Sequence, residues 1–480
     1  MLRPAILTAG PTILAIFAVA GALLSIRASL SAGEPATPAG KASDKAAVGG
    51  ITRVEFAATI YVSPTGNDVW SGKLAAPNAD KTDGPLATPA AARDAVRKLK
   101  VGGKLPGQVL VMFRGGTYFL KEPLVFTPED SGLKQAPIGY RAFPRETPVL
   151  SGGRLITGFK KGEGGRWTAE VPDVKNGKWR FRQLFVNGER RERSRLPKEG
   201  FFTVAKADFK GNWQAGADRF GYAEGDIKAA WVNPTDIEVV VLHFWTDAHL
   251  PVASIDEATR TVTFTKKTTK RLSDDYNDQG ARYYVENVFE ALRPGQWYLD
   301  RKAGLLHYIP LPGEDMEKAE VIAPRLDCLV RFDGDPGAGR FVESIEISGL
   351  TFSHTEWDLP AGKAGDHQAA VDVPGTIRAR GAKDIIIENC VINHGATYGV
   401  DIAEGCDGWN ISENEIADMG GGGVKLNGGG AESKRDLQTG DIIIQYNRIH
   451  DCGKLWPSAC GILSRNSAKN SPPRYSVWVA

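Results

Sequence analysis

Four polar residues occupy the same place in four similar segments of the chain: His354, His394, Asp418 and Asp451. If these segments stack as neighbouring strands about 4.8 Å apart, imidazoles and carboxylates lie side by side along one column. A carboxylate raises the pKa of a neighbouring imidazole, which can then donate a proton. The alternative is that the four residues only end strands at solvated turns.

A second set of ionisable residues lies nearby in the sequence. Asp401 and Lys425 hold equivalent places in the segments YGVDI and GGVKL, and Glu404 follows Asp401 closely. If the flanking aliphatic residues point inward, Asp401 and Lys425 point outward and face each other. The pair is then either a surface salt bridge, which adds little stability, or a site residue beside its charged partner.

The elements that must position these residues are repeated strands. Apolar residues recur at the first, third and eighth places of four segments: IEISGLTFSH from Ile345, IIIENCVINH from Ile385, WNISENEIAD from Trp409 and IIIQYNRIHD from Ile442. The step of 24 residues between the second and third segments is typical of one coil of a parallel β-helix, and the longer steps add outward loops. The repeat predicts that Ile387, Ile411 and Ile444 lie above one another. Unrelated hairpins that match by chance are the alternative.

A second repeated frame begins at Tyr398, Gly422 and Cys460, in step with the first. Asn414 and Asn447 share one place in the first frame, as expected for stacked amides that cap a tight inward turn. Both features favour stacked coils.

Cysteine and glycine usage adds three smaller predictions. Cys390 falls at a core place and is expected to be a free buried thiol, whereas Cys452 and Cys460 bracket a loop and are candidates for a disulfide after export. The glycine run 420–423 lacks the strand–helix context of a phosphate-binding loop, so we expect a coil turn.

The overall composition is that of a folded, turn-rich β protein. Among 480 residues, 59 are Lys or Arg and 57 are Asp or Glu, which gives a net charge of +2, and 55 are Gly. Such a balance lacks the positive field that nucleic acid or an anionic membrane surface would attract. We expect a monomer with no nucleic-acid partner.

The amino terminus has the order of a secretory signal. Arg3 precedes an apolar run over residues 5–26, and small residues follow it through Ala32. We expect residues 1–32 to be a signal peptide and residues 33–55 to be an Ala/Gly/Pro-rich linker, which places the rest in the periplasm or outside the cell. Without cleavage, the apolar run would anchor the protein in a membrane.

The remaining chain divides into three zones. Residues 56–153 have the pattern of strands around one helix, which Thr88 caps and Pro89 opens, and we expect N-terminal coils with a capping helix. Residues 154–324 hold six of the 11 Trp among alternating strands, which predicts a β-sandwich-like insert. Residues 325–480 carry the repeats.

The last residues depart from the repeat. A further coil would open near residue 471, but Pro472 and Pro473 stand there and cannot donate hydrogen bonds to a strand. We expect nothing after Ile462 to complete a coil or to cap the stack, and hence a truncated chain that lacks several coils. The alternative is a naturally short protein whose last residues fold back as a cap.

Several segments together resemble a known family: ATIYVSPTGND, RQLFVNGERRERSR, YYVENVFEAL, WYLDRKAGLLHYIPLPGE and GLTFSH. Over about residues 59–466 the chain resembles secreted bacterial β-helix proteins of the pectin-lyase-like superfamily, and among them the glycoside hydrolases that have fucosidase and xylanase members and a β-sandwich-like insert. The resemblance implies an all-β fold: a right-handed parallel β-helix with an N-terminal capping helix and an inserted domain. It specifies the reaction poorly, because β-helices host hydrolases, lyases, esterases and adhesins.

The favoured function is a secreted glycoside hydrolase that acts on plant or algal polysaccharide, without metal or cofactor. Cleavage by the common route needs two carboxyl groups; we expect Asp401 as one, and Glu404 or Asp418 as the second. A truncated chain would lack part of this groove and its activity. Aromatic rings stack on sugars and imidazoles bond hydroxyls, so the expected substrate-binding residues are His354, Trp357, His367, His394, Tyr398 and Lys425.

Two other functions remain open. A polysaccharide lyase on the same fold would use Lys425 or an Arg as its base and usually Ca²⁺. The segment from Asp275 to Glu286 approaches the spacing of a calcium loop, but strand-like residues flank it and Gln279 replaces a ligand, so we expect no calcium there. The third possibility is a non-catalytic carbohydrate-binding or cell-surface protein.

Overall fold

The structure, a computed structural model, describes residues 56–100, 105, 107–274, 279–468 and 478–479. These residues are predominantly β, as the sequence predicts. The expected signal peptide (1–32) and linker (33–55) lie outside the described residues, as do Asp275 and Asn277 of the calcium-loop-like segment. In the described part of the chain, no helix is long and apolar enough to cross a bilayer.

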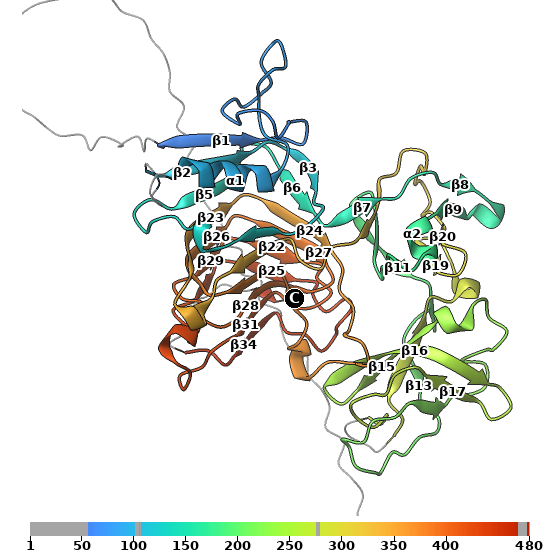
Figure 1. Cartoon of the computed structure of the whole chain (residues 1–480). Helices are drawn as coiled ribbons and strands as arrows, with labels where there is room; N and C mark the ends of the chain where they lie inside the picture. Colours follow the sequence, from blue (N-terminus) through green and yellow to red (C-terminus); the bar gives the residue numbers. More distant parts are fainter. Residues whose placement is uncertain (1–55, 101–104, 106, 275–278, 469–477, 480) are drawn as a thin grey trace, which may run out of the picture. The chain divides into compact units, whose positions relative to one another are not determined.

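Three parallel sheets can be followed in the described residues (Figure 1), and we call them sheets 1, 2 and 3. Sheet 1 contains β1 (Ala58–Val62), β2 (Val109–Phe113), β5 (Ile138–Ala142), β23 (Val342–Ser348), β26 (Ala382–Glu388), β29 (Asn410–Ser412) and β32 (Ile443–Gln445). Sheet 2 contains β3 (Gly116–Phe119), β6 (Pro148–Ser151), β24 (Thr351–Thr355), β27 (Val391–Gly395), β30 (Glu415–Ala417), β33 (Arg448–His450) and β35 (Trp478–Val479). Sheet 3 contains β4 (Leu124–Phe126), β22 (Val330–Asp333), β25 (Gly375–Arg380), β28 (Tyr398–Ile402), β31 (Val424–Asn427) and β34 (Ile462–Arg465). From β2 to β34 the chain visits sheets 1, 2 and 3 in that order, and each such passage is one coil.

The predicted register of the coils is confirmed. Ile387 pairs with Ile411, and Ile411 pairs with Ile444, in parallel strands of sheet 1. In sheet 3, Val400 pairs with Val424, so the second frame is also in step. These aliphatic side chains are buried in one core cluster that runs along the coils. Stacking equivalent residues buries a continuous apolar core that no single coil could bury alone.

A ladder of amides closes one turn of the coils, as the repeat predicts. Asn414 is buried; its Nδ2 donates to Ile387 O (2.9 Å) and to Asn447 Oδ1 (2.9 Å), and its Oδ1 accepts from Cys390 N (2.9 Å). Asn447 repeats the contact one coil further on, with Nδ2 donating to Ile411 O (2.8 Å). The side chains therefore satisfy backbone groups that the turn leaves unpaired.

Replacing Asn414 by Ala is expected to lower the free energy of unfolding by roughly 2–4 kcal/mol, because each buried polar group left unpaired costs about 1–3 kcal/mol. Denaturant unfolding of the purified protein measures this change. The control is Asn67→Ala, since Asn67 is exposed and its side chain accepts a local bond from Val69 N (3.2 Å). Equal effects of the two substitutions would contradict a stabilising ladder.

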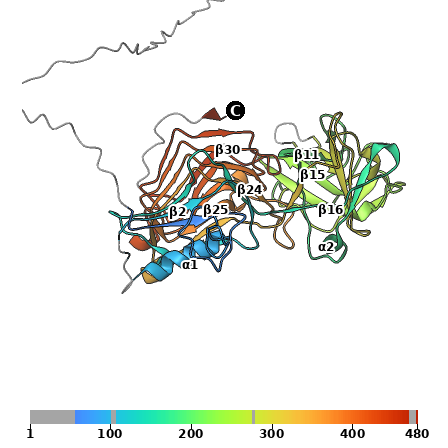
Figure 2. The ribbon, with the colours of Figure 1, turned by 90° about the horizontal axis from the view of Figure 1, so that it is seen from above.

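The predicted capping helix is present as α1 (Pro89–Leu99). Thr88 is its N-cap, with Oγ1 accepting from Ala91 N (3.1 Å), and Pro89 opens the first turn. Ala92 and Val96 are buried in the core cluster of the coils. The helix therefore lies against β1 and β4 at the first coils (Figure 2).

The segment between β6 and β22 forms two further sheets in the described residues, with the helix α2 (Pro172–Lys175). One contains, in order, β7 (Gly153–Leu155), β21 (Val321–Pro324), β10 (Leu184–Val186), β11 (Glu189–Arg193), β19 (Gln296–Asp300), β20 (Leu305–Tyr308), β9 (Trp167–Glu170) and β8 (Lys160–Lys161). The other contains β12 (Arg195–Leu196), β18 (Arg282–Glu286), β15 (Glu238–His243), β16 (Thr246–Asp256), β17 (Thr261–Phe264) and β14 (Arg219–Gly221), with β13 (Phe202–Thr203) on β18. Each sheet has its own core cluster, whereas a single sandwich would share one core between both. The alternation of apolar and polar residues predicted the strands of the insert. It does not specify which sheet faces pack against each other.

Long excursions of the chain leave from the corner between sheets 2 and 3. The insert departs after β6 and returns before β22, where Gly152 O accepts from Arg325 N (2.9 Å) and Leu326 N (3.0 Å). The loop 356–374, between β24 and β25, and the loop 451–461, between β33 and β34, leave the same corner. This corner therefore gathers polar residues that are far apart in the sequence.

One strand does follow Ile462, contrary to the expectation that nothing there would add to the stack. β35 pairs in parallel with β33, with Trp478 beside Arg448 and Val479 beside Ile449. Pro472 and Pro473 lie outside the described residues.

Candidate active site

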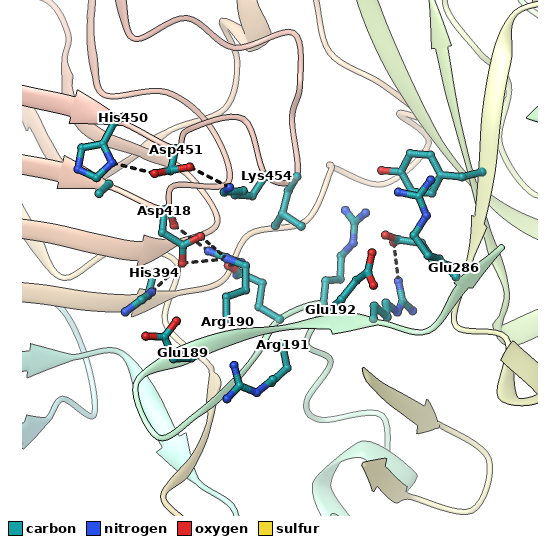
Figure 3. A pocket seen from close by; sticks show the side chains of 17 residues that line it. Glu189, Arg190, Arg191, Glu192, Glu286, His394, Asp418, His450, Asp451 and Lys454 are labelled. Atoms are coloured by element: carbon teal, nitrogen blue, oxygen red, sulfur yellow. Dashed lines mark hydrogen bonds and ion pairs between the residues drawn. The ribbon is translucent and has the colours of Figure 1, made fainter. Parts of the chain in front are cut away.

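A cleft of about 600 Å³ lies between the insert and the corner of sheets 2 and 3 (Figure 3). The corner contributes His394, Asp418 and Asp451, which belong to the polar column found in the sequence. The insert contributes Glu189 and Arg190 from β11. The cleft therefore joins the repeated coils to a segment more than two hundred residues away in sequence.

Asp418 is held in the cleft by hydrogen bonds from two side chains. Its carboxylate accepts hydrogen bonds from Arg190 Nε (2.8 Å to Oδ1 and 3.0 Å to Oδ2) and from His394 Nδ1 (2.7 Å to Oδ2). Burial alone would raise the pKa of Asp418, but the hydrogen bond from His394 and the charge of Arg190 outweigh it and hold the pKa below its usual range. Asp418 is therefore ionised at neutral pH.

Arg190 is itself fixed in place. Its Nη2 donates to Asp418 O (2.8 Å), its Nη1 donates to Gln183 Oε1 (2.6 Å), and its guanidinium lies over the ring of Phe185 at 4.9 Å. The strands β10 and β11 that carry these residues form a hairpin, and its turn at Asn187 and Gly188 has positive φ angles of 53° and 78°. The hairpin brings a cation from the insert onto the carboxylate of a coil.

The two ends of the column differ in exposure. His354 is buried, its Nδ1 lies 2.9 Å from Ser151 Oγ, and its ring is stacked on that of His394 at 5.6 Å. Burial and the neighbouring His394 lower the pKa of His354 to about 3, so it stays neutral. Asp451 is exposed; the hydrogen bond with His450 (2.9 Å) and the nearby Lys454 lower its pKa.

The backbone explains why His and Asp recur at this corner. His354, His394, Asp418 and Asp451 have φ angles of 66°, 55°, 50° and 52°, in the left-handed region. Asp and His enter this region more readily than β-branched or bulky residues do. The turn geometry thus accounts for the residue types, and the insert then covers part of the column to make a cleft.

Asp401 and Lys425 lie on the outer face of sheet 3, as expected, but they do not line this cleft. Lys425 Nζ lies 3.2 Å from Asp401 Oδ2 and donates to Val371 O (2.8 Å) and Val373 O (2.6 Å) of the loop 356–374. This loop leaves Lys425 only 3% exposed. Burial raises the pKa of Asp401, and Lys425 opposes that shift. The structure thus places Asp401 and Asp418 on different surfaces. The ion pair of Asp401 and Lys425 binds the loop 356–374 to sheet 3.

Replacing Lys425 by Met is expected to lower the free energy of unfolding by roughly 3–5 kcal/mol, as for a buried ion pair that loses one partner. Asp401 and the two loop carbonyls would lose their cation. Denaturant unfolding measures the change. The control is Lys318→Met, because Lys318 is 85% exposed and its pair with Asp315 is worth about 0–1 kcal/mol. A similar, small change in both variants would show that Lys425 does not hold the loop.

The other expected site residues fall in different places. Glu404 is near Arg380 (3.6 Å) on the surface and does not line the cleft. Tyr398 is fully buried, with its hydroxyl donating to Ala369 O (2.6 Å), and the ring of Trp357 packs on buried Trp456 at 5.1 Å. The burial of Tyr398 and Lys425 leaves them no surface for a sugar. His367 is 70% exposed and lines a second cavity.

Sequence reasoning did not single out Arg190 or the other charged residues of β11. The signal that points to them is the Asn-Gly turn followed at once by ERRER, because such a turn predicts a hairpin whose second strand is densely charged.

The cysteines are free thiols in the described residues. Cys390 is buried as predicted, and burial raises the pKa of its thiol to about 12. The disulfide considered between Cys452 and Cys460 is absent: Cys452 Sγ lies against His450 O (3.5 Å), whereas Cys460 N donates to the Tyr398 hydroxyl (3.2 Å). The sequence showed that the two cysteines bracket a loop, but the packing of Trp456 inside that loop decides where they lie.

The glycine run 420–423 forms a turn between β30 and β31, as predicted. A Cβ atom on Gly422 would lie 1.9 Å from Cys460 O and 2.3 Å from the Tyr398 ring. Glycine is needed because neighbouring coils approach too closely for any side chain.

Comparison with known proteins gives one family match and a fold similarity. The family described as "GH141 insertion domain" matches residues 164–311, within the insert. A solved structure titled "Glycoside hydrolase" is 24% identical, with a TM-score of 0.74 over 85% of this chain and 76% of that one. The structure of XylC with xylose (15% identity, TM-score 0.44) covers 88% of this chain and 60% of its own. No curated protein matches. The chain is thus similar in fold to a glycoside hydrolase and carries a segment that matches the insertion domain of GH141.

Proposed function

We propose that this protein is a secreted glycoside hydrolase that cleaves a plant or algal polysaccharide in the cleft. The observation that carries the proposal is Asp418, an ionised carboxylate held by Arg190 and His394 at the wall of an open cleft. A volume of about 600 Å³ is within the range of small-molecule sites. The family match within the insert supports the reaction class.

The proposed chemistry uses two carboxyl groups on neighbouring coils. Asp418 acts as nucleophile or as the base that takes a proton from water, since its pKa keeps it charged. Asp451, one coil further along the same column, protonates the departing glycosidic oxygen. A bound sugar that buries Asp451 would raise its pKa toward that role. His450, whose pKa is raised mainly by its hydrogen bond with Asp451, carries the proton and passes it to Asp451 as Asp451 gives its own to the departing oxygen.

For the architecture, we propose that the three parallel sheets form a right-handed parallel β-helix. The fixed order in which the chain visits the sheets supports this, and crossovers between parallel strands are right-handed in almost all proteins. The proposed division is a signal peptide (1–32), a linker (33–55), N-terminal coils (56–153), the insert (154–324) and further coils (325–480).

A lyase that uses Lys425 as its base is less well supported. Lys425 Nζ donates to two loop carbonyls and faces Asp401, so the amine has no open path to a sugar in this structure. A lyase would also release unsaturated sugars that absorb ultraviolet light, which a hydrolase does not produce.

Incubation of the purified protein with a panel of plant and algal polysaccharides tests the proposal. We expect new reducing ends, no rise in ultraviolet absorbance and no effect of EDTA. Binding without release of reducing ends would favour a non-catalytic carbohydrate-binding protein and would overturn the proposal.

A further inference from the structure

A second cavity, of about 970 Å³, lies between the other sheet of the insert and the loops of sheet 3. The insert side carries Trp213 and Trp245, which are 40% and 45% exposed, with ring centroids 5.7 Å apart. The opposite side carries His367 and Asp372 of the loop 356–374. Exposed aromatic faces opposite polar groups are what a sugar ring needs, because it has both an apolar face and a rim of hydroxyls.

The turn that presents Trp245 has an uncommon backbone. β15 and β16 form a hairpin whose two-residue turn is Phe244 and Trp245, and Phe244 has a φ of 53°. Such turns usually carry Asn or Gly, because a bulky side chain is strained in the left-handed region. Strained residues cluster at functional sites. The chain therefore maintains an unfavourable turn that places an indole at the edge of the cavity.

Several charged groups of this cavity lie beside a partner. Lys270 Nζ lies 4.5 Å from the Trp213 ring centroid and 4.1 Å from that of Trp245. Asp372 Oδ2 lies 2.9 Å from His367 Nδ1 and 3.5 Å from Lys363 Nζ. Asp366 and Arg465 also line the cavity, which therefore carries charges of both signs and is suited to a neutral ligand rather than a strong anion.

One loop contributes to both this cavity and the proposed active site. Residues 454 and 455 of the loop 451–461 line the cleft, and Cys460 of the same loop lines the second cavity. Both hollows have one wall from the insert and the other from the coils. The same loop and the same two parts of the chain therefore shape both hollows.

We propose that Trp213, Trp245 and His367 form a second saccharide-binding surface, which holds a further stretch of the neutral polysaccharide that is cleaved in the cleft. This inference rests on the proposed function for the identity of the ligand. It predicts that the protein binds long chains more tightly than short oligosaccharides that fill the cleft alone.

The test measures binding in the Asp418→Asn background, so that cleavage does not interfere. Arabinoxylan, xyloglucan and mixed-linkage β-glucan are embedded in native gels, and the retardation of the protein gives the dissociation constant. The double variant Trp213→Ala/Trp245→Ala is expected to bind about tenfold more weakly to whichever polysaccharide retards the wild type, because two stacked rings are lost. The single variant Trp245→Phe keeps an aromatic face beside Trp213. It should therefore retain most of the affinity of the wild type.

Tyr446→Ala is the matched control, because Tyr446 is 59% exposed and lines neither hollow. Unchanged polymer affinity in the double variant would overturn the second surface, and so would retardation only by anionic polygalacturonate. Self-association of the wild type that the double variant abolishes, measured by analytical ultracentrifugation, would also overturn it by making this face a dimer contact. If the double variant loses affinity while Asp418→Asn keeps full hydrolysis, the surface stands and the cleft assignment fails. If Asp418→Asn is inactive and the double variant binds normally, the cleft assignment stands and the second surface fails.

Discussion

Replacing Asp418 by Asn is expected to lower kcat for polysaccharide cleavage by about 10³-fold or more, because the amide can neither attack the sugar nor take a proton from water. The substitution keeps the shape of the side chain, and the amide oxygen can still accept one hydrogen bond from Arg190 or His394. The measurement is the initial rate of reducing-sugar release from the substrate identified in the panel, with near-ultraviolet circular dichroism to confirm the fold.

Asp401→Asn is the control for this loss. Asp401 does not line the cleft, and its carboxylate faces Lys425 beneath the loop 356–374. We expect this variant to keep most of its activity at a temperature where it remains folded. Loss of activity in Asp401→Asn with little change in Asp418→Asn would return the site to the outer face of sheet 3 and contradict the cleft.

The same experiment separates the roles of the two carboxyl groups. Asp451→Asn should cleave a polysaccharide slowly but an aryl glycoside with an acidic phenol nearly as fast as the wild type, because such a leaving group needs no protonation. Asp418→Asn should lose both activities. Equal losses on both substrates in Asp451→Asn would contradict its role as proton donor.

Removing the cation of Arg190 is expected to give the second large effect. In Arg190→Ala the carboxylate of Asp418 loses the charge of Arg190 and the hydrogen bonds from its Nε but keeps His394, and burial still raises its pKa. We expect kcat/KM to fall by about 10²-fold, as for a misplaced catalytic group. The acidic limb of its pH profile should move to higher pH, because burial then acts on Asp418 without the opposing charge of Arg190.

The ionisation of Asp418 also makes the stability of the fold depend on pH. In the native protein the pKa of Asp418 lies below its value in the unfolded chain, so its ionisation adds stability above the unfolded pKa, and this stability is lost as the pH falls through the native pKa. Arg190→Ala removes much of that depression, so its stability should depend less on pH over the acidic range. Glu192→Gln is a suitable control on the same strand. An unshifted acidic limb in Arg190→Ala would show that Arg190 does not set the ionisation of Asp418.

Much of the coil architecture follows from local sequence. The apolar spacing determined which residues stack, because a strand that is one residue out of register would turn its aliphatic side chains outward, and Ile387, Ile411 and Ile444 pair as expected. The column that contains His394 and Asp418 was also readable, since each coil makes the same left-handed turn at the same place. The Thr88 cap and Pro89 placed α1 for equally local reasons.

What the sequence could not decide was which polar residues would share a cavity. Asp401 and Asp418 are close in sequence and equally plausible as carboxylates, yet one turn of the coil sends them to different surfaces. Arg190 contacts Asp418 because the hairpin of β10 and β11 in the insert lies against the corner of sheets 2 and 3 from which the insert departs. The repeat of the coils is a local property, so the spacing of residues in the sequence reveals it. The cleft depends on contacts between distant segments, and these form only when the chain folds.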